Sequence, residues 1–331
     1  MKADVYGVGN SLVDTLAFVD QDFVREHDLA PGSMTLVEAE KQAAILLGLS
    51  RHQLELRSGG SAANTMIAVA RSGGTSFYTG KVSRDTNGEF YRQDLLAAGI
   101  HFDVHPAAET DGPTGTCVVL TTPDAERTML THLGVSIQLS ANDINEDRIK
   151  ASKMIYIEGY LWAGESTRAA CIRAAEMGRK HQVPVAFTFS DSFLVAPFRS
   201  DFFGFVKDYS SVVFCNAPEV RSFSEMDKLE DAALYAGQIA DTVFVTNSEH
   251  GALVVEHGKI TEVPGFRVKA IDTNGAGDAF AGGTLFGLCR GYSSAHSARW
   301  GNFLASEIVQ IPGARLTRDY SSQVRTIIGS P

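Results

Sequence analysis

The chain has 331 residues, of which 44% are hydrophobic and 21% are charged, and its formal net charge at pH 7 is −10. This length and composition exclude wholesale disorder and allow one large core with a small accessory domain. The acidic balance argues against nucleic acid as the main partner, because duplex binding needs a basic face.

The sequence carries no pattern of export or membrane insertion. No apolar run reaches the ~18 residues that a membrane span needs, and the amino-terminal residues lack a basic stretch followed by an apolar segment. The four cysteines are widely spaced and never form a CxxC pair, which favours reduced, buried thiols over metal or redox sites. We therefore expect a cytoplasmic protein with no membrane partner.

Alternating strand and helix patterns run along most of the chain. Residues 4–10 and 76–82 are expected as buried strands, and helices are expected over residues 38–49, 62–71 and 85–98. Further strands are expected at 154–160, 183–190, 211–216 and 242–246, with helices at 165–181, 198–207, 218–226, 231–240, 276–290, 293–310 and 320–328. Residues 251–266 read as a hairpin that turns at His257-Gly258. The alternation predicts an α/β fold with a doubly wound, mainly parallel sheet and helices on both faces.

Five other segments alternate apolar and polar residues and predict half-exposed strands. They are residues 11–20, 33–37, 101–105, 114–121 and 127–133. We expect them to form a small β flap, a lid built from about residues 11–37 and 101–133 and inserted into one large domain that spans the chain.

Polar residues and glycines recur at the predicted strand ends. They are Asn10, the Gly59-Gly60 turn, Tyr160, Asn216, Thr246 and Asp272. Ligands of a doubly wound sheet bind beyond the carboxyl ends of its strands, so one crevice is expected to collect these residues.

The most informative stretch is Asp-Thr-Asn-Gly-Ala-Gly-Asp at residues 272–278, which opens a predicted helix. The N–H groups of Gly275, Ala276 and Gly277, together with the positive end of the helix dipole, favour an anion. Asp278 is either a first-turn acid that complements the dipole or a general base that takes a proton from an incoming hydroxyl group. We favour the base, because a capping acid does not need Gly-Ala-Gly before it.

Two other nucleotide motifs are incomplete. The dinucleotide fingerprint begun by Gly7-Val-Gly9 has leucine at Leu12, where its third glycine belongs. Around Gly80-Lys81, Thr75 replaces the first glycine of a P-loop and Val82 replaces its Ser/Thr. A nicotinamide-dependent oxidoreductase and a Walker-type NTPase are therefore not favoured.

At residues 272–278 and 57–64 the chain resembles the ribokinase (PfkB) family of sugar and nucleoside kinases, and most of all its adenosine kinase branch. The resemblance implies Mg²⁺ and ATP-dependent phosphorylation of the primary 5′-hydroxyl of a nucleoside, adenosine before others. A sugar kinase of the same family, an inosine or guanosine kinase, and a non-catalytic nucleotide-binding protein are the alternatives. Small molecules are the expected partners, and the protein is expected as a monomer or homodimer.

Five residues are implied by the resemblance to bind the acceptor and its phosphate: Asn10, Asp14, Gly60, Asn64 and Arg127. A carboxylate such as Asp14 accepts from two neighbouring hydroxyl groups at once, which suits the cis-diol of a ribose. The alternative for Asp14 is an acid on a solvated strand face. Arg127, in the flap, is implied to reach the phosphates when the flap closes, and its alternative is a solvated arginine.

The resemblance implies that Thr246, Gly251 and Asn302 border the base and ribose of ATP, although Asn302 is equally read as a solvated helical residue. It implies metal-associated roles for Asn216, Glu219 and Asp272. Mg²⁺ keeps much of its water shell and is held by such groups through water. Asp272 is implied to order the same ion or, with Gly313 nearby, a monovalent cation such as K⁺. The alternative for Asn216 and Glu219 is an ordinary helix start beside Pro218.

One departure from adenosine kinases concerns the acceptor base. Those enzymes carry two successive aromatic residues where this chain has Tyr160-Leu161. The sequence thus predicts a pocket with one stacking partner fewer.

Overall fold

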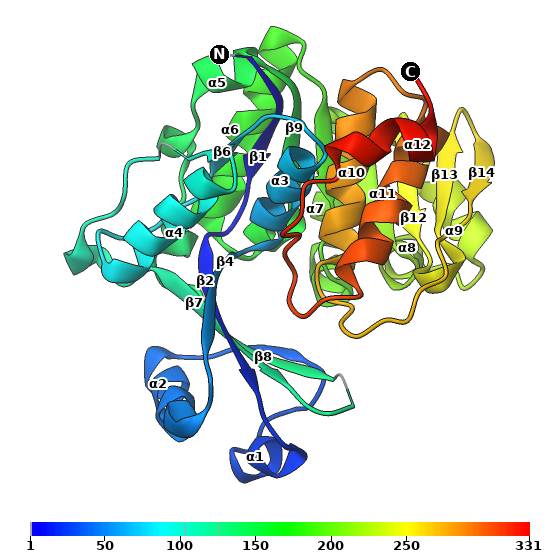
Figure 1. Ribbon diagram of the computed structural model, residues 1–331. Helices are drawn as coiled ribbons and strands as arrows, with labels where there is room; N and C mark the ends of the chain where they lie inside the picture. The colour runs from blue at the N-terminus through cyan, green and yellow to red at the C-terminus, as the bar shows by residue number, and fades with distance from the viewer. Residues whose placement is uncertain (1, 103, 125) are drawn as a thin grey trace.

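The computed structural model describes residues 2–102, 104–124 and 126–331 of the chain. Over these residues the strands form one sheet of nine strands and one of five. Figure 1 shows the larger sheet inside an α/β body, from which the five-stranded sheet projects at one end. We refer to the two parts as the body and the small sheet.

The sheet of the body is mainly parallel and its strand order reverses beside the first strand. In spatial order its strands are β14 (Lys259–Val263), β13 (Ala252–Glu256), β12 (Thr242–Thr246), β11 (Ser210–Asn216), β10 (Val185–Thr188), β9 (Ser152–Glu158), β1 (Ala3–Val8), β5 (Ser76–Thr79) and β6 (Ile100–His101). Pairing is parallel from β12 to β6, and β13 and β14 add an antiparallel hairpin. The predicted doubly wound, mainly parallel sheet is confirmed.

Helices cover both faces of this sheet, because parallel strands are apolar on both sides. One face packs against α5 (Glu146–Lys150), α6 (Glu165–His181), α7 (Ser192–Tyr209), α8 (Ala217–Ser224) and α9 (Leu229–Ala236). The other packs against α3 (Ser61–Arg71), α4 (Thr86–Ala97), α10 (Ala276–Cys289) and α11 (Ser294–Ile308), and α12 (Val324–Ile328) lies against α11. None of the helices in the described part of the chain is both long and apolar enough to cross a bilayer.

Small residues let α10 approach its neighbours closely. A Cβ atom on Gly283 would lie 3.0 Å from the Cα atom of Gly301 in α11. On the other side, a Cβ atom on Gly282 would lie 2.5 Å from the Cβ atom of Ala68 in α3. The position of α10, and with it the loop that precedes it, is therefore set by two helices distant in sequence.

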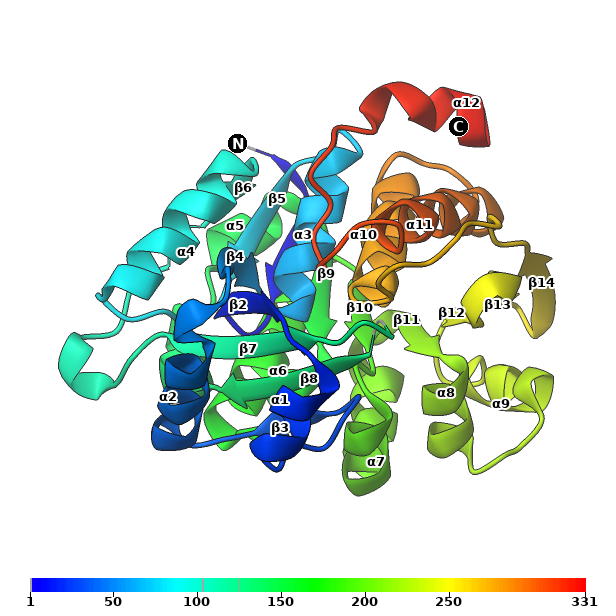
Figure 2. The same cartoon turned by 60° about the horizontal axis from the view of Figure 1, so that its bottom comes forward.

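The small sheet has the order β3 (Met34–Leu36), β8 (Arg127–His132), β7 (Gly115–Thr121), β2 (Leu12–Phe18) and β4 (Glu55–Gly59). Burial alternates along β2, as its sequence predicts. One face packs against α1 (Gln21–Glu26) and α2 (Ala39–Gly48) around a separate apolar cluster. In Figure 2, which brings the bottom of Figure 1 forward, this sheet lies in front of the body.

One predicted flap strand belongs to the body instead. Residues 101–105 were expected in the flap, but His101 lies in β6, which pairs with β5 of the main sheet. Residue 103, in the same segment, is outside the described residues. The alternation that suggested a half-exposed strand reflects the edge of the main sheet, where one strand face is less covered. Strand β4 was not expected, because its five residues carry little pattern of their own.

Two local expectations had different outcomes. The hairpin turn at His257-Gly258 is confirmed, with both residues at positive φ. Helix α7 begins at Ser192 and not at residue 198, because Asp191 caps its first turn by accepting from the N–H of Phe193. Pro197 is accommodated by a kink at Phe198, so the proline does not mark the helix start.

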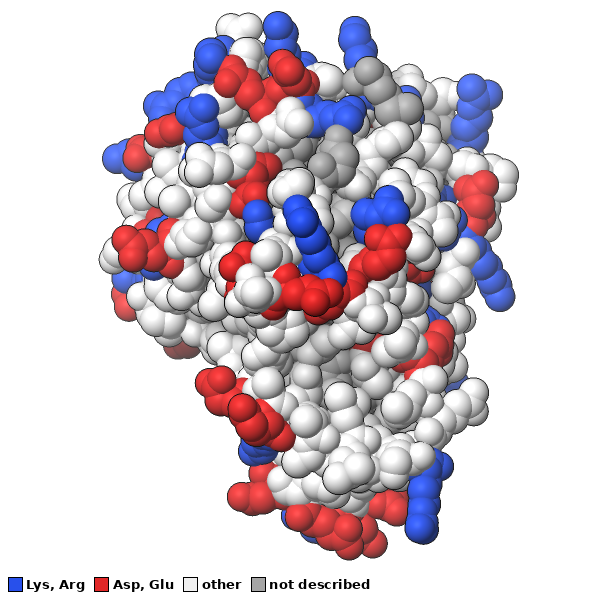
Figure 3. Space-filling view, turned by 90° about the vertical axis from the view of Figure 1, so that its left-hand side faces the viewer, with Lys and Arg blue, Asp and Glu red and all other residues white. Residues whose placement is uncertain are grey.

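The charged surface has no single sign on the face drawn in Figure 3. Acidic and basic side chains are intermixed there over the body, and acidic side chains gather at the far end of the small sheet.

Candidate active site

A cavity of about 1160 Å³ lies at the carboxyl ends of the body strands and extends beneath the small sheet. Most of the candidate residues line it, from six separate parts of the chain: Asn10, Asp14, Gly60, Asn64, Asn216, Glu219, Thr246, Gly251, Gly275, Ala276, Gly277, Asp278 and Asn302. Tyr160 lines it as well. Arg127 and Asp272 are not among its walls. The expected crevice thus gathers thirteen of the fifteen candidates.

The turn before α10 is shaped to face a ligand. Gly275 has a φ of 74°, and a Cβ atom there would overlap the backbone of Ala314. A Cβ atom on Gly277 would meet nothing within 4 Å, so this position opens into the cavity. The N–H groups at this helix start, of which that of Ala276 also donates to the carbonyl oxygen of Thr273 at 3.4 Å, therefore adjoin space that an anion can occupy.

Asp278 sits in the first turn of α10 and is held by α3. Its two carboxylate oxygens accept from Ser61 Oγ at 2.6 Å and from Asn64 Nδ2 at 3.1 Å. Burial raises the pKa of Asp278 to about 6, although these two hydrogen bonds lower it. A carboxyl group with such a pKa is ionised at neutral pH and still basic enough to accept a proton. The sequence did not single out Ser61, and it implied a substrate contact for Asn64, whose side chain here orients Asp278.

Glu158, at the end of β9, is a buried acid that the sequence analysis missed. Its carboxylate accepts from Asn10 N at 2.7 Å, Asn10 Nδ2 at 3.0 Å and Ala62 N at 2.8 Å. Burial raises the pKa of Glu158 to about 7. It ties the corner between β1 and β2 to the start of α3. The register of β9 beside β1 places it there, and only the fold supplies that register.

The same corner between β1 and β2 also depends on Gly60. This residue has a φ of 99°, and a Cβ atom on it would overlap the carbonyl oxygen of Asn10, which also accepts from the hydroxyl group of Tyr78 at 2.7 Å. Asn10 Oδ1 accepts from Ser136 Oγ at 2.8 Å. The polar atoms of Asn10 thus serve largely to fix the corner.

Asp14 points from β2 into the cavity and lies against Gly59. Its pKa is raised to about 7, first by burial and then by the negative charge of Asp278, while Arg57 lowers it. A carboxylate in this environment is stabilised when hydroxyl groups donate hydrogen bonds to it. The interpretation of Asp14 as an acid on a solvated face is wrong.

Several aromatic residues line the cavity, Tyr160 among them. Leu161 is buried in the core of the body and does not line the cavity. Phe193, at the start of α7, does line it, and its ring centroid lies 6.3 Å from that of Tyr160. A second ring beside Tyr160 thus comes from a different segment of the chain, and the number of rings that stack on the acceptor base stays a prediction.

The residues implied at the ATP base are held by the hairpin edge of the sheet. Asn302 is buried, and its Nδ2 donates to the carbonyl oxygens of Val263 at 2.9 Å and Pro264 at 3.2 Å. The alternative of a solvated helical asparagine is therefore wrong. Gly251 has a φ of 96°, and Thr246 Oγ1 donates to the carbonyl oxygen of Cys215 at 3.4 Å.

Asn216 and Glu219 form a reciprocal cap at the start of α8. Asn216 Oδ1 accepts from Glu219 N at 2.8 Å, and the Glu219 carboxylate accepts from Asn216 N at 3.0 Å and from Asn216 Nδ2 at 2.7 Å. Burial raises the pKa of Glu219 to about 7. Within the described residues no cluster of three or more His, Cys, Asp or Glu could hold a metal directly. Because Asn216 already donates to both oxygens of this buried acid at the cavity wall, a Mg²⁺ ion beside it would be held through water and not by direct coordination.

Asp272 and Arg127 are paired with each other. The Arg127 guanidinium, on β8 of the small sheet, forms an ion pair with Asp272 Oδ1, and both side chains are buried. Asp272 also accepts from Asn274 N at 2.8 Å and Gly313 N at 2.7 Å. Both oxygens are engaged, so a K⁺ ion at this carboxylate does not fit the arrangement. Arg127 is neither solvated nor directed into the cavity.

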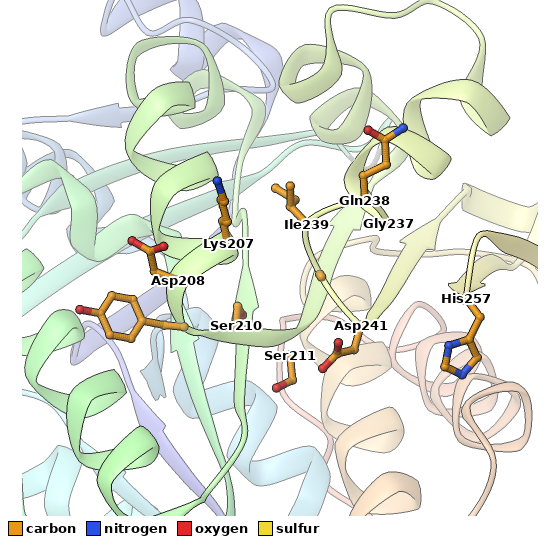
Figure 4. A pocket seen from close by; sticks show the side chains of 11 residues that line it. Lys207, Asp208, Ser210, Ser211, Gly237, Gln238, Ile239, Asp241 and His257 are labelled. Atoms are coloured by element: carbon orange, nitrogen blue, oxygen red, sulfur yellow. The ribbon is translucent and has the colours of Figure 1, made fainter.

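A second concavity, of about 520 Å³, lies at the amino-terminal ends of β11 and β12. Figure 4 shows its side chains spread around a rim, with His257 well separated from Lys207 and Asp208. Because these side chains do not converge, the cavity at the opposite strand ends is the candidate active site.

A doubly wound body, a small sheet over the strand ends and a glycine turn at a helix start define a ribokinase-like fold. Residues 39–319 match the sequence profile of the pfkB family carbohydrate kinases, and the chain belongs to this family of enzymes, which phosphorylate a hydroxyl group. It is 29% identical over 336 residues to adenosine kinase 1 of Arabidopsis thaliana, covering 93% of this chain and 94% of that protein.

Two solved structures are also similar. The adenosine kinase from Sinorhizobium meliloti superposes with a TM-score of 0.91 at 34% identity, over 98% of this chain and 99% of that one. A probable sugar kinase protein from Rhizobium etli CFN 42 has the same TM-score and coverage at 31% identity. Both similarities extend over 98% of this chain and are not confined to one part of it.

Proposed function

We propose that this kinase transfers the γ-phosphoryl group of ATP to the 5′-hydroxyl group of adenosine, yielding AMP and ADP. One observation carries the proposal: the Asp278 carboxylate, held by Ser61 and Asn64, faces the same cavity as the Asp14 carboxylate and the Gly275–Gly277 turn. The adenosine kinases among its relatives support the choice of acceptor.

Each group has a place in the transfer. Asp278 accepts the proton of the attacking 5′-hydroxyl group, and the N–H groups of residues 275–277 face the charge on the transferring phosphoryl group. Asp14 accepts from the 2′- and 3′-hydroxyl groups of the ribose. The rings of Tyr160 and Phe193 lie where an aromatic base can stack. Thr246, Gly251 and Asn302 border the adenine side of ATP.

Mg²⁺ fits beside Asn216 and Glu219, which would hold it through water. When bound, the ion neutralises charge on the phosphates. A requirement for K⁺ is not part of the proposal, because the oxygens of Asp272 are engaged by Arg127 and by the N–H groups of Asn274 and Gly313.

The small sheet serves as the lid of this site. Its face toward the body places Asp14 and Cys117 at the cavity wall, while its other face is covered by α1 and α2. A lid that excludes water limits hydrolysis of ATP in place of transfer. Compared with the expected boundaries, the small sheet also includes β4 and has α2 packed on it, whereas His101 and Ala107 pair with segments of the body.

The test is a panel of acceptors assayed with Mg-ATP by ADP release and by the mass of the phosphorylated product. Adenosine is expected to give the highest kcat/KM, followed by inosine and guanosine, with ribose and fructose lowest. A free sugar with a higher kcat/KM than every nucleoside would leave the kinase family intact and overturn the proposed acceptor.

A further inference from the structure

We infer that Arg315 is a positioning residue for phosphoryl transfer, because its ion pair with Asp94 ties the acceptor corner at Gly59-Gly60 to the anion-binding turn at Gly275. Neither residue lines the cavity. The inference rests on the kinase reaction but not on adenosine as the acceptor.

The Arg315 guanidinium joins three separate segments. Its Nη1 atom forms an ion pair with Asp94 Oδ2 of α4 and donates to Ser58 Oγ of β4 at 2.9 Å. Its Nη2 atom donates to the carbonyl oxygen of Asp94 at 3.4 Å. Ser58 donates to the same Asp94 oxygen from its N at 3.0 Å and its Oγ at 2.7 Å. Arg315 is 9% exposed, so its charge is largely removed from water and depends on these partners.

The cluster of Arg315, Asp94 and Ser58 holds the acceptor corner on one side. Ser58 directly precedes Gly59, whose missing side chain leaves the space taken by the Asp14 carboxyl group. The next residue, Gly60, packs on the backbone of Asn10 and starts α3, which carries the two donors to Asp278. A shift of Ser58 would therefore move the groups that meet the acceptor.

On the other side, the cluster holds the loop under the anion-binding turn. Ala314, the neighbour of Arg315, lies so close to Gly275 that a Cβ atom there would overlap it. Gly313 N donates to Asp272 Oδ2 at 2.7 Å. The loop thus touches both the start and the middle of residues 272–278, and Arg57 of β4 reinforces the same link by donating to Pro312 O at 3.3 Å.

In-line transfer depends on the distance between the attacking oxygen and the phosphorus atom, which the acceptor corner and the anion-binding turn set jointly. A misplacement of about 1 Å can cost about 100-fold in rate. Arginine suits this task because its planar fork reaches a carboxylate, a hydroxyl group and a carbonyl group together, whereas lysine offers one point charge.

The experiment compares the full-length wild type with Arg315→Met, Arg315→Lys and Asp94→Asn, using the acceptor that the wild type phosphorylates best. Arg318→Met, an exposed arginine three residues on, is the matched control. For Arg315→Met we expect kcat to fall about 10- to 100-fold while KM for Mg-ATP changes less than about threefold. We also expect more ADP formed per acceptor phosphorylated, because water competes better with a displaced hydroxyl group. Arg315→Lys should recover part of kcat, and Arg318→Met should match the wild type.

A double variant, Asp94→Asn with Arg315→Met, completes the test. Its loss in kcat should be close to that of Arg315→Met alone, because both changes remove one interaction. The inference is overturned if the losses multiply, or if the variants melt at lower temperature but keep wild-type kcat and ADP ratio per folded molecule. If Arg315→Met does not fold, Arg315→Lys and Asp94→Asn decide by the same two readouts. An error in the proposed acceptor would show in the wild type and leave these ratios interpretable.

Discussion

At the scale of single residues, the cavity concentrates acids that burial makes weaker. The pKa of Asp278 is raised to about 6, and those of Asp14 and Glu158 to about 7, in each case mainly by burial. Two of these carboxyl groups also interact with each other, since the charge of Asp278 raises the pKa of Asp14. Perturbed acids that share a cavity mark a site where proton transfer is controlled.

Replacing Asp278 with asparagine should abolish most turnover, because an amide cannot accept the hydroxyl proton. Base catalysis contributes about 10²- to 10⁴-fold in rate, so kcat should fall by that factor while binding of ATP is retained. Asp231→Asn, at the exposed first turn of α9, is the control. A folded Asp278→Asn enzyme that keeps more than about a tenth of wild-type kcat would refute the assignment.

The rate should depend on pH through the same group. The base acts only when ionised, so kcat/KM should fall as the pH drops below the pKa of about 6 for Asp278 and level off above it. Asp14, with a pKa of about 7, must also be ionised to accept hydroxyl groups, so the higher of the two pKa values sets the midpoint, which should lie near 7. Steady-state rates from pH 5 to 9 test this, and a level profile across that range contradicts it.

Asp14→Ala should weaken acceptor binding and reduce discrimination against 2′-deoxyadenosine. In the wild type, the deoxy analogue leaves a buried acceptor group unpaired, which costs about 1–3 kcal/mol or roughly 5- to 150-fold in kcat/KM. Without the carboxylate, adenosine and deoxyadenosine should differ much less. An unchanged ratio of the two kcat/KM values would place the ribose elsewhere.

At the scale of elements, the start of α10 is fixed by its two helical neighbours and by the loop at Ala314. Close contacts at Gly282 and Gly283 hold the helix, and Gly275 packs on the loop. Only Gly277 is free of such contacts, because its open side is the cavity. The turn is thus packed against protein on its other sides and open on the side where a phosphate would lie.

Gly277→Val should therefore block the phosphoryl position without disturbing the fold. We expect kcat to fall at least about 100-fold, the loss typical of a damaged oxyanion-binding group. Gly204→Val is the matched control, since Gly204 is also in a helix and a Cβ atom on it meets nothing within 4 Å. Melting curves of both variants separate stability from catalysis. Normal turnover by the Gly277→Val enzyme would exclude the anion-binding role.

At the scale of the whole molecule, one buried ion pair joins the small sheet to the body. Arg127 of β8 and Asp272 are 9% and 4% exposed, and burial lowers the pKa of Arg127 to about 10, which still leaves it charged at neutral pH. Asp272 begins the stretch that ends at Asp278. The position of the lid is thus coupled to the loop that faces the phosphate.

Arg127→Met should destabilise the protein by about 3–5 kcal/mol, because it leaves the Asp272 charge buried without its cation. Adding Asp272→Asn should restore much of that stability. Arg25→Met, which breaks an exposed pair with Asp22, should cost at most about 1 kcal/mol. Denaturant unfolding gives the free energy of unfolding of the wild type, Arg127→Met, the double variant and Arg25→Met. Hydrogen exchange should show faster opening of β8 in Arg127→Met. Equal stability of Arg127→Met and the wild type would exclude the coupling.

The sequence by itself determined the features that are local. The doubly wound sheet follows from alternating strand and helix patterns, the hairpin turn at residues 257–258 from its glycine, and the family from residues 272–278. The carboxyl ends of parallel strands lie at the same edge of a sheet, so the shared cavity could be expected as well. Each of these rests on spacing within a short segment or on general topology.

Only the tertiary structure decided what depends on partners distant in the chain. Glu158 reaches Asn10 through strand register, Ser61 reaches Asp278 through helix packing, and Phe193 comes to lie beside Tyr160 at the cavity. The pairing of Arg127 with Asp272, and the placement of residue 101 in the body, follow from the same cause. A side chain's type shows what it can bind, but its partner is set by which segments the fold brings within a few ångströms, and a single sequence does not encode that in any local pattern.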